Sequence, residues 1–276
     1  RVALFETAFF QWTSDASSTY AIPQAWRDLG IRRYGFHGAS HKFIAERSAE
    51  LVGNEVVADR ARRLYVDGPG EYTGDSLRVI SCHLGGSSSV VGINNGVAIG
   101  SSMGFSPQSG LPQNNRVGDL DSMAIPYVSK MLGLSVEEAE RQLNKESGLL
   151  GLSQVSNDAR DIDEAAAAGN ANAQLAIDVL TDSIRHWAGS FFFKMGGAEV
   201  ISFTAGMGEN DPVLRAAVCA GLEGLGVKID SDRNAKVIRG AEGVISSDDS
   251  TIKVVVIPAN EELVIAREVY RNIQAS

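Results

Sequence analysis

At 276 residues the chain is long enough to bury a sizeable core, and its 44% hydrophobic and 21% charged residues are typical of a globular protein. Its 25 basic and 34 acidic residues give a formal net charge of −9, which opposes binding to a nucleic-acid backbone or an anionic membrane surface. An anionic substrate must therefore be held by a few placed cations, by backbone N–H groups or by a metal ion.

Hydropathy and cysteine content predict a cytoplasmic protein. No apolar stretch is long enough to span a bilayer, and the N-terminus lacks a secretory signal pattern. Cys82 and Cys219 lie far apart in apolar stretches without neighbouring His or Cys, which predicts reduced core residues. The chain begins with Arg1 and a strand-like apolar run at residues 2–5, so we expect a cut through a larger protein.

The predicted elements alternate between helices and buried strands. In chain order they are a helix at 40–51, a strand at 77–82, a hairpin at 90–99, helices at 135–143 and 171–193, a strand at 199–203, a helix at 212–222, a strand at 252–257 and a helix at 261–273. Asp211-Pro212 is a favourable helix start, and Asn-Gly in the hairpin is a favourable turn. This alternation predicts an α/β protein with a mixed sheet.

Two glycine-rich segments that follow predicted strands are candidate phosphate sites. Residues 83–89, His-Leu-Gly-Gly-Ser-Ser-Ser, offer small residues whose N–H groups can approach phosphate oxygens closely. Residues 203–210, Phe-Thr-Ala-Gly-Met-Gly-Glu-Asn, run from a strand into a helix start. The second segment does not fit the dinucleotide fingerprint, because Asp211 stands at the position of the third glycine, and the sequence contains no Gly-Lys-Ser/Thr phosphate loop. Each is also compatible with an ordinary turn.

Three other polar residues stand out, each with a structural alternative. His37 lies between two glycines on a loop before a helix, where it can reach a ligand or simply form a structural hydrogen bond. Arg116 lies in a polar, glycine-bounded loop and can bind a substrate or form a surface ion pair. Glu261 starts the last helix, where a carboxylate can bind a metal ion or stabilise the helix N-terminus.

Taken in this order, the segments resemble the acetate kinases, a family in the superfamily of sugar kinases, actin and heat-shock ATPases. Residues 5–10, Phe-Glu-Thr-Ala-Phe-Phe, are similar to the family's Phe-Asp-Thr-Ala-Phe-His. Residues 34–41 are similar to its Gly-Phe-His-Gly-Thr-Ser-His, and residues 116–119 to its Arg-Ser-Gly-Asp. The resemblance runs nearly end to end and implies a ribonuclease H-like fold, in which a mixed sheet flanked by helices is duplicated.

The resemblance also implies roles for individual residues. Glu6, His37 and Arg116 would be catalytic, the last two by binding the transferring phosphoryl group. Phe36 and Pro107 would wall the pocket for the alkyl end of the substrate. The implied nucleotide-binding residues are His83, Gly85, Gly86, Ser87, Asp158, Arg160, Gly206, Gly208, Glu209 and Asn210.

The implied reaction is the reversible phosphorylation of acetate by ATP, giving acetyl phosphate and ADP by direct in-line transfer. Glu261 would face a Mg²⁺ or Mn²⁺ ion. Such a transfer depends on positioning and charge neutralisation more than on covalent chemistry. The planar fork of Arg116 suits two phosphoryl oxygens, and His37 would donate a hydrogen bond, better still if protonated.

Several positions depart from the family pattern. Glu6 replaces an aspartate, Phe10 a histidine and Gly86 an asparagine in the phosphate hairpin. Pro-Gln-Asn-Asn at residues 112–115 replaces the family's Met-Gly-Thr before the arginine. The family's first strand and phosphate loop, and a substrate arginine, should precede Arg1, so we expect the chain to be N-terminally truncated and, by itself, weakly active or inactive.

These departures leave alternatives open. Acetate, propionate and butyrate differ by single methylenes, each worth only about 1–3 kcal/mol in an apolar pocket, so a propionate or butyrate kinase is a related possibility. A catalytically silent nucleotide-binding paralogue with a regulatory or structural role is a second one.

The resemblance further predicts how the chain is divided and assembled. Residues 1–20 would end an N-terminal domain segment, residues 21–258 would form the C-terminal nucleotide-binding domain, and residues 259–276 would return toward the N-terminal domain. We expect a homodimer, with ATP and a short-chain carboxylate as ligands and no nucleic-acid or membrane partner.

Overall fold

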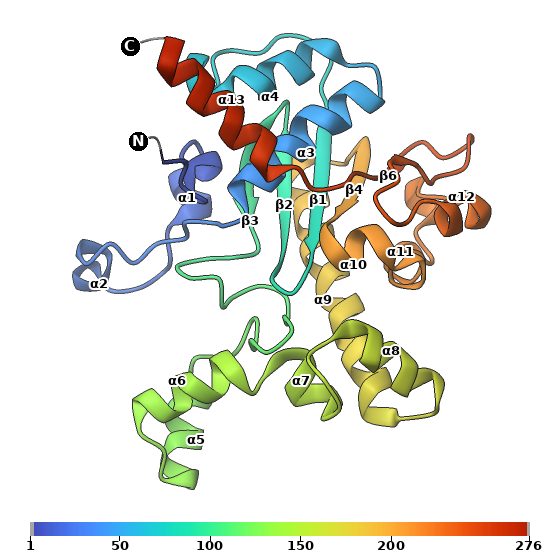
Figure 1. Ribbon diagram of the computed structural model, residues 1–276. Coiled ribbons are helices and arrows are strands. Elements are labelled where there is room, and N and C mark those ends of the chain that lie inside the picture. Colours follow the sequence, from blue (N-terminus) through green and yellow to red (C-terminus); the bar gives the residue numbers. More distant parts are fainter. Residues whose placement is uncertain (1–2, 275–276) are drawn as a thin grey trace.

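The computed structural model describes residues 3–274, which surround one mixed β-sheet with helices (Figure 1). The strands are β1 (Arg78–Leu84), β2 (Ser88–Asn94), β3 (Val97–Ser101), β4 (Val200–Thr204), β5 (Gly243–Val244) and β6 (Lys253–Val256). The helices are η1 (Ala8–Phe10), α1 (Asp15–Ser18), α2 (Gln24–Asp28), α3 (Gly38–Leu51), α4 (Glu55–Asp67), α5 (Ala124–Leu132), α6 (Val136–Lys145), α7 (Gly148–Ser153), α8 (Ala159–Ala167), α9 (Ala171–Met195), α10 (Ala205–Asn210), α11 (Pro212–Cys219), η2 (Glu223–Leu225), α12 (Ser231–Lys236) and α13 (Glu261–Gln274).

The sheet combines an antiparallel half with a parallel half. Its strand order is β3-β2-β1-β4-β6-β5. Strand β2 is antiparallel to β1 and β3, β4 is parallel to β1 and β6, and the edge strand β5 is antiparallel to β6. The register pairs His83 of β1 with Thr204 of β4, so the carboxyl ends of these two strands lie side by side. In such sheets ligands bind at the carboxyl ends of the parallel strands.

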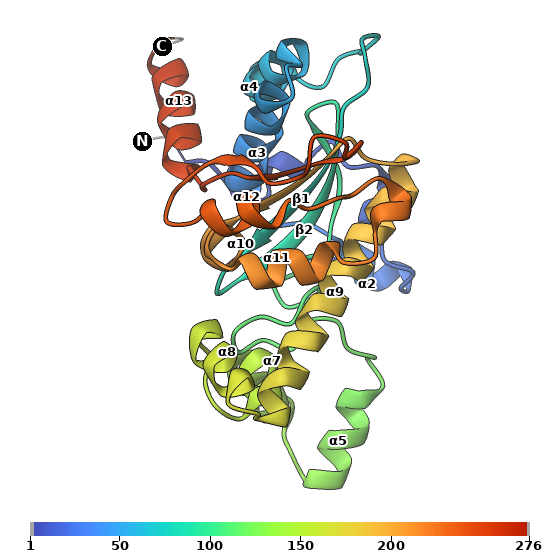
Figure 2. The same cartoon turned by 90° about the vertical axis from the view of Figure 1, so that its right-hand side faces the viewer.

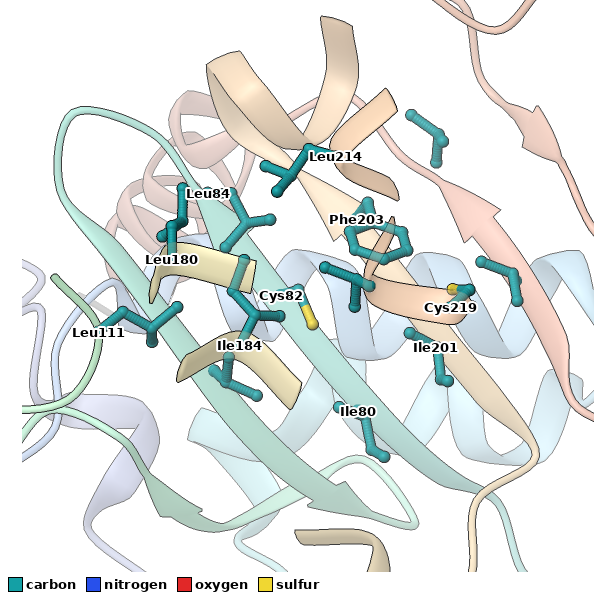
Figure 3. Packing of buried hydrophobic residues seen from close by; sticks show 14 of the residues in the cluster. Ile80, Cys82, Leu84, Leu111, Leu180, Ile184, Ile201, Phe203, Leu214 and Cys219 are labelled. Carbon is teal, nitrogen blue, oxygen red and sulfur yellow. The ribbon is translucent and has the colours of Figure 1, made fainter. Parts of the chain in front are cut away.

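Alternation along β1 sends successive side chains to opposite faces of the sheet. Ile80, Cys82 and Leu84 join the hydrophobic cluster on the face covered by α9 and α11 (Figure 3). Val79 joins the cluster on the other face, together with residues of α3 and α4. By the same alternation, the polar Ser81 and His83 face α3. The fold therefore presents polar side chains of β1 to the helix that begins after His37.

Helices that cover the two faces come from distant parts of the sequence. Helix α13 lies beside α3 and α4 at the top of Figure 1, and Val264 of α13 joins the cluster on that face. The 25-residue α9 runs along the opposite face and continues into a lower lobe with α5 to α8 (Figure 2). None of the helices within residues 3–274 is both long and apolar enough to cross a membrane.

The three predicted strands, the hairpin and the five predicted helices are confirmed, with ends that differ by a few residues. Asp211 caps α11 as predicted, because its Oδ1 accepts the Leu214 N–H at 2.8 Å. The strand-like interpretation of residues 2–5 is wrong for the described residues 3–5, which pair with no strand and leave Phe5 72% exposed. Residues 1 and 2 lie outside the described part, and the domain boundaries at residues 20 and 258 stay a prediction.

Candidate functional site

A cavity of about 550 Å³ lies at the carboxyl ends of β1 and β4. The turn between β1 and β2 and the start of α10 form part of its wall. It is lined by Gly85, Gly86, Asn114, Asp158, Ala159, Arg160, Asp163, Gly206, Met207, Asn210 and Asp211. Six of the ten residues predicted to bind nucleotide therefore meet in one cavity, although they come from three separate parts of the chain.

The start of α10 has an unusual backbone. Ala205 adopts a left-handed conformation with φ of 64°, directly after the extended Thr204 that ends β4. A non-glycine residue in this region is strained, and such strain is concentrated at functional sites. This geometry sets the direction of Gly206 and Asn210, which both line the cavity.

Two other residues of the 203–210 segment support the cavity from outside and do not line it. Gly208 is buried against β1 and β4, and its carbonyl oxygen accepts a hydrogen bond from the fully buried guanidinium of Arg215 at 2.9 Å. Glu209 accepts the N–H of Ala259 at 2.9 Å, two residues before Glu261. The segment is thus linked to the start of α13.

The α8 side of the cavity carries three charged groups. Asp158 caps α8 and forms an ion pair with Arg160 at 2.6 Å, in which the arginine side chain is largely exposed and the aspartate side chain is partly buried. Asp163, one turn further along α8, was not predicted. Burial, and then the charge of Asp211, raise the pKa of Asp163 to about 6. The cavity wall thus combines one cation with several carboxylates.

Three histidines form a buried cluster between β1 and α3. The rings of His37 and His83 stack, with centroids 4.1 Å apart and an interplanar angle of 17°. Each imidazole is hydrogen-bonded to a serine at 2.8 Å: His37 to Ser89, His83 to Ser40, and His41 to both Ser81 and Ser89. Stacking on His83 of β1 and a hydrogen bond to Ser89 of β2 thereby fix His37 at the start of α3.

The cluster is held in the neutral form. Burial, and then the charge of Arg116, lower the pKa of His37 to about 4. Burial, and then His37, lower the pKa of His83 to about 3, and burial lowers the pKa of His41 well below its usual value. The expectation that protonation would improve His37 as a donor does not suit this environment, because burial, and then the charge of Arg116, disfavour a charged imidazole.

Arg116 reaches the phosphate turn through an amide that the sequence analysis did not select. Gln113 is 1% exposed, and its Oε1 accepts hydrogen bonds from Arg116 Nη1 at 3.2 Å and from Ser87 Oγ at 2.8 Å. Its Nε2 donates to the carbonyl oxygen of Pro107 at 2.5 Å. Gln113 therefore links Arg116, predicted to be catalytic, to Ser87, predicted to bind nucleotide, and to Pro107, predicted to wall the substrate pocket.

Helix α7 holds this loop from the other side. The N–H groups of Leu149 and Leu150 donate to the carbonyl oxygens of Gln113 and Asn114 at 2.8 and 2.9 Å. These N–H groups belong to the first turn of the helix, where no carbonyl oxygen of the same helix can accept them. The loop that carries Arg116 thus accepts hydrogen bonds from the free N–H groups at the start of α7, and these bonds fix the loop.

Pro107 and Arg116 line a second cavity, of about 720 Å³, with Tyr20, Arg33 and apolar residues that include Ile125. Phe36, predicted to wall the same pocket, is half-buried in the loop before α3 and is not among the residues that line this cavity.

Glu6 and Glu261 lie close enough for their charges to interact. The Gly38 N–H donates to the carbonyl oxygen of Glu6 at 3.0 Å, which places Glu6 beside the start of α3. Burial, and then the charges of Glu6 and Glu262, raise the pKa of Glu261. Within residues 3–274 no group of three His, Cys, Asp or Glu could hold a metal ion. Two repelling carboxylates still fit Mg²⁺, which keeps several waters and binds through one or two carboxylates and substrate phosphates.

Gln113, Asn114 and Asp163 are the main residues that sequence analysis missed. The first two lie in the stretch that departs from the family's Met-Gly-Thr, so this departure was the available signal. No signal in the sequence pointed to Asp163, because whether it lines the cavity depends on how α8 packs in the folded chain.

A mixed sheet of this order, with glycine-containing turns at the carboxyl ends of neighbouring parallel strands, defines an α/β protein of the acetate and sugar kinase and actin-like ATPase superfamily. The chain belongs to the acetokinase family, whose model matches residues 1–267.

The relatives agree with this assignment. The chain is 43% identical over 269 residues to an acetate kinase of Staphylococcus aureus, a match that covers 97% of this chain and 63% of the relative. The crystal structure of an acetate kinase from Porphyromonas gingivalis superposes with a TM-score of 0.86 at 35% identity, covering 96% of this chain and 62% of that one. A propionate kinase from Francisella tularensis gives 0.83 at 33% identity, covering 96% and 62%. The chain thus spans less than two thirds of the length of these relatives.

Proposed function

We propose that the full-length protein is an acetate kinase, which transfers the terminal phosphoryl group of ATP to a carboxylate oxygen of acetate. One observation carries the proposal: the Arg116 guanidinium is tied to Ser87 of the phosphate turn, directly or through Gln113. A cation placed beside a phosphate turn is what in-line phosphoryl transfer requires. Relatives named acetate kinases support the substrate.

In the forward step an acetate oxygen forms a bond to the terminal phosphorus as the bond from phosphorus to the ADP oxygen breaks. Arg116 would neutralise the charge on the phosphoryl oxygens, worth several kcal/mol in a dry site. His37, neutral around pH 7, would donate one N–H while its Nδ1 stays hydrogen-bonded to Ser89. Glu6 would replace the family's aspartate at the reacting end. Phe36 and Pro107 would wall the alkyl side.

A Mg²⁺ ion, when bound, would neutralise the nucleotide phosphates. Glu261, with Glu6, would hold it from the start of α13, whose position is linked through Ala259 to Glu209. The six predicted nucleotide-binding residues that line the cavity, Gly85 and Gly206 among them, would supply further contacts to the nucleotide. We place the protein in the cytoplasm, where ATP is available.

We further propose a homodimer through the lower lobe. Helix α5 has no buried residue, and the α5–α6 face exposes large apolar side chains. They are Leu120, Met123, Ile125, Tyr127, Val128, Met131, Leu132 and Val136. An isolated nine-residue helix is marginal in water, so a partner surface would stabilise α5. Contiguous apolar patches of this kind mark interaction sites.

The test is acyl phosphate formation from ATP, Mg²⁺ and acetate, propionate or butyrate, in the full-length protein beside this 276-residue chain. Activity in the full-length protein, highest with acetate, is the expected result. Nucleotide binding without product in either protein would contradict the proposal and support a silent paralogue. Restoring aspartate with Glu6→Asp would then show whether a single lost contact is responsible.

A further inference from the structure

Gly86 and Asn114 lie against each other at the edge of the candidate nucleotide cavity. The N–H of Asn114 donates to the carbonyl oxygen of Gly86 at 3.3 Å. A Cβ atom on Gly86 would meet Asn114 Nδ2 at 3.3 Å and Cγ at 3.7 Å. The carboxamide of Asn114 therefore occupies the space beside the phosphate turn into which a side chain at position 86 would project.

The same two positions are exchanged relative to the family pattern. The pattern has asparagine where this chain has Gly86. Counted back from Arg116, the glycine of Met-Gly-Thr falls on Asn114. Each position thus holds the residue that the pattern has at the other, and the structure brings the two into contact. One asparagine side chain lies at this edge in either arrangement.

The Asn114 carboxamide is available to a ligand. Its backbone is fixed on both sides, by Gly86 and by the Leu150 N–H that donates to its carbonyl oxygen at 2.9 Å. Asn114 lines the cavity, and its side chain, whose Nδ2 lies beside Gly86, forms no hydrogen bond with any residue of the described range 3–274. A fixed backbone with an unengaged amide at the tip is a preorganised donor.

The residues that line the cavity carry more negative than positive charge. Arg160 is the cation among the lining residues, and Asp158 already pairs with it at 2.6 Å. Asp163 and Asp211 add negative charge on the same wall. Among the described lining residues a phosphate on the Gly85-Gly86 turn would meet no unpaired cation, so a neutral donor on this side would add to its binding, while Arg116 lies outside this lining.

We propose that Asn114 binds the phosphate group of the nucleotide that rests on the Gly85-Gly86 turn, through its Nδ2–H, and that it replaces from the opposite loop the asparagine missing at position 86. The inference rests on the proposed function and deepens it. It also removes the Gly86 substitution as an argument for a silent paralogue, because the lost amide is supplied by another segment.

Exchanging the residues at positions 86 and 114 tests the proposal. The KM for ATP and for acetate, and kcat, would be measured on the full-length protein and on Asn114→Gly, Gly86→Asn and the double variant with both changes. Asn115→Gly is the matched control, because it introduces the same flexible residue next to Arg116 but does not line the cavity. Thermal melting would show that each variant is folded.

Asn114→Gly should raise the KM for ATP roughly 10- to 100-fold, the usual effect of losing a hydrogen bond to a charged group, with little change in the KM for acetate. Gly86→Asn alone should also impair ATP binding, because its side chain crowds the Asn114 amide. The double variant should recover to within about 3-fold of the wild type, because it restores one asparagine at this edge.

An active wild type with an unchanged KM for ATP in Asn114→Gly would overturn the inference. A double variant no better than the two single variants would also overturn it, because the two positions would then not share one role. An inactive wild type that still binds ATP would instead contradict the proposed function. In that case the dissociation constant for ATP, measured on the wild type, the two single variants and the double variant, would test the inference independently of activity.

Discussion

At the residue scale, burial decides how the three clustered histidines behave. Burial lowers the pKa of His37 to about 4, while the unfolded chain has the ordinary value near 6.5. The unfolded state therefore binds more protons below pH 6.5, and stability is lost as the pH falls from 6.5 toward 4. Between pH 7 and pH 5 this loss is about 2 kcal/mol for His37 alone.

Replacing His37 with glutamine should reduce this pH dependence by up to that amount, because glutamine does not titrate. The measurement is the free energy of unfolding in urea at pH 7 and pH 5. His186→Gln is the control, because His186 is an exposed histidine outside the cluster. Equal losses of stability in the wild type and in His37→Gln would contradict a buried, neutral His37.

Arg116 should not tolerate lysine. Arg116→Lys keeps the charge but loses the planar fork that pairs with two phosphoryl oxygens, so we expect kcat to fall about 100- to 1000-fold. Arg141→Lys, at an exposed arginine of α6 that pairs with Glu138, should leave kcat unchanged. A near-normal kcat in Arg116→Lys would show that charge alone suffices.

At the scale of elements, α7 and the arginine loop depend on a close approach at Gly148. Gly148 has φ of 63°, and a Cβ atom there would lie 2.0 Å from the carbonyl oxygen of Gln113 and 2.5 Å from that of Arg116. Gly148→Ala should therefore displace the loop, cost about 3 kcal/mol or more of unfolding free energy and lower kcat.

Gly53→Ala is the matched control for this prediction. Gly53 has a similar φ of 79°, but nothing lies within 4 Å of its Cβ position. It should cost only about 1–2 kcal/mol, for the left-handed backbone, and leave kcat unchanged. Urea unfolding and steady-state rates on both variants would separate backbone strain from displacement of the loop, and similar effects would argue against the close approach.

At the scale of the whole molecule, the exposed face of α5 should hold the proposed dimer together. Tyr127 and Met131 are 65% and 64% exposed, one helical turn apart. Tyr127→Glu with Met131→Glu should dissociate the dimer, because two charges would be buried in an apolar interface. Val56→Glu should not, since Val56 is 66% exposed but belongs to α4 at the opposite end of the molecule (Figure 1).

Sedimentation of these proteins at micromolar concentration would give the answer. A wild type that sediments as a monomer would contradict the homodimer. A dimer that survives both glutamates would place the interface on another surface.

The sequence by itself determined the elements and the family. Apolar periodicity located the strands and helices because their periods, two and 3.6, are local properties of the chain. The ordered motifs around His37, Gly85, Arg116 and Gly206 were sufficient for the resemblance that the family comparison confirms.

Only the tertiary structure decided which side chains meet and in what state. The register of β1 against β4 brought Gly85 and Gly206 into one cavity. Contact between the β1–β2 turn and the loop before α7 placed Asn114 against Gly86 and made Gln113 the link to Arg116. Gly86 and Asn114 are 28 positions apart and Gly85 and Gly206 are 121 positions apart, so no local pattern in the sequence specifies which of these residues meet.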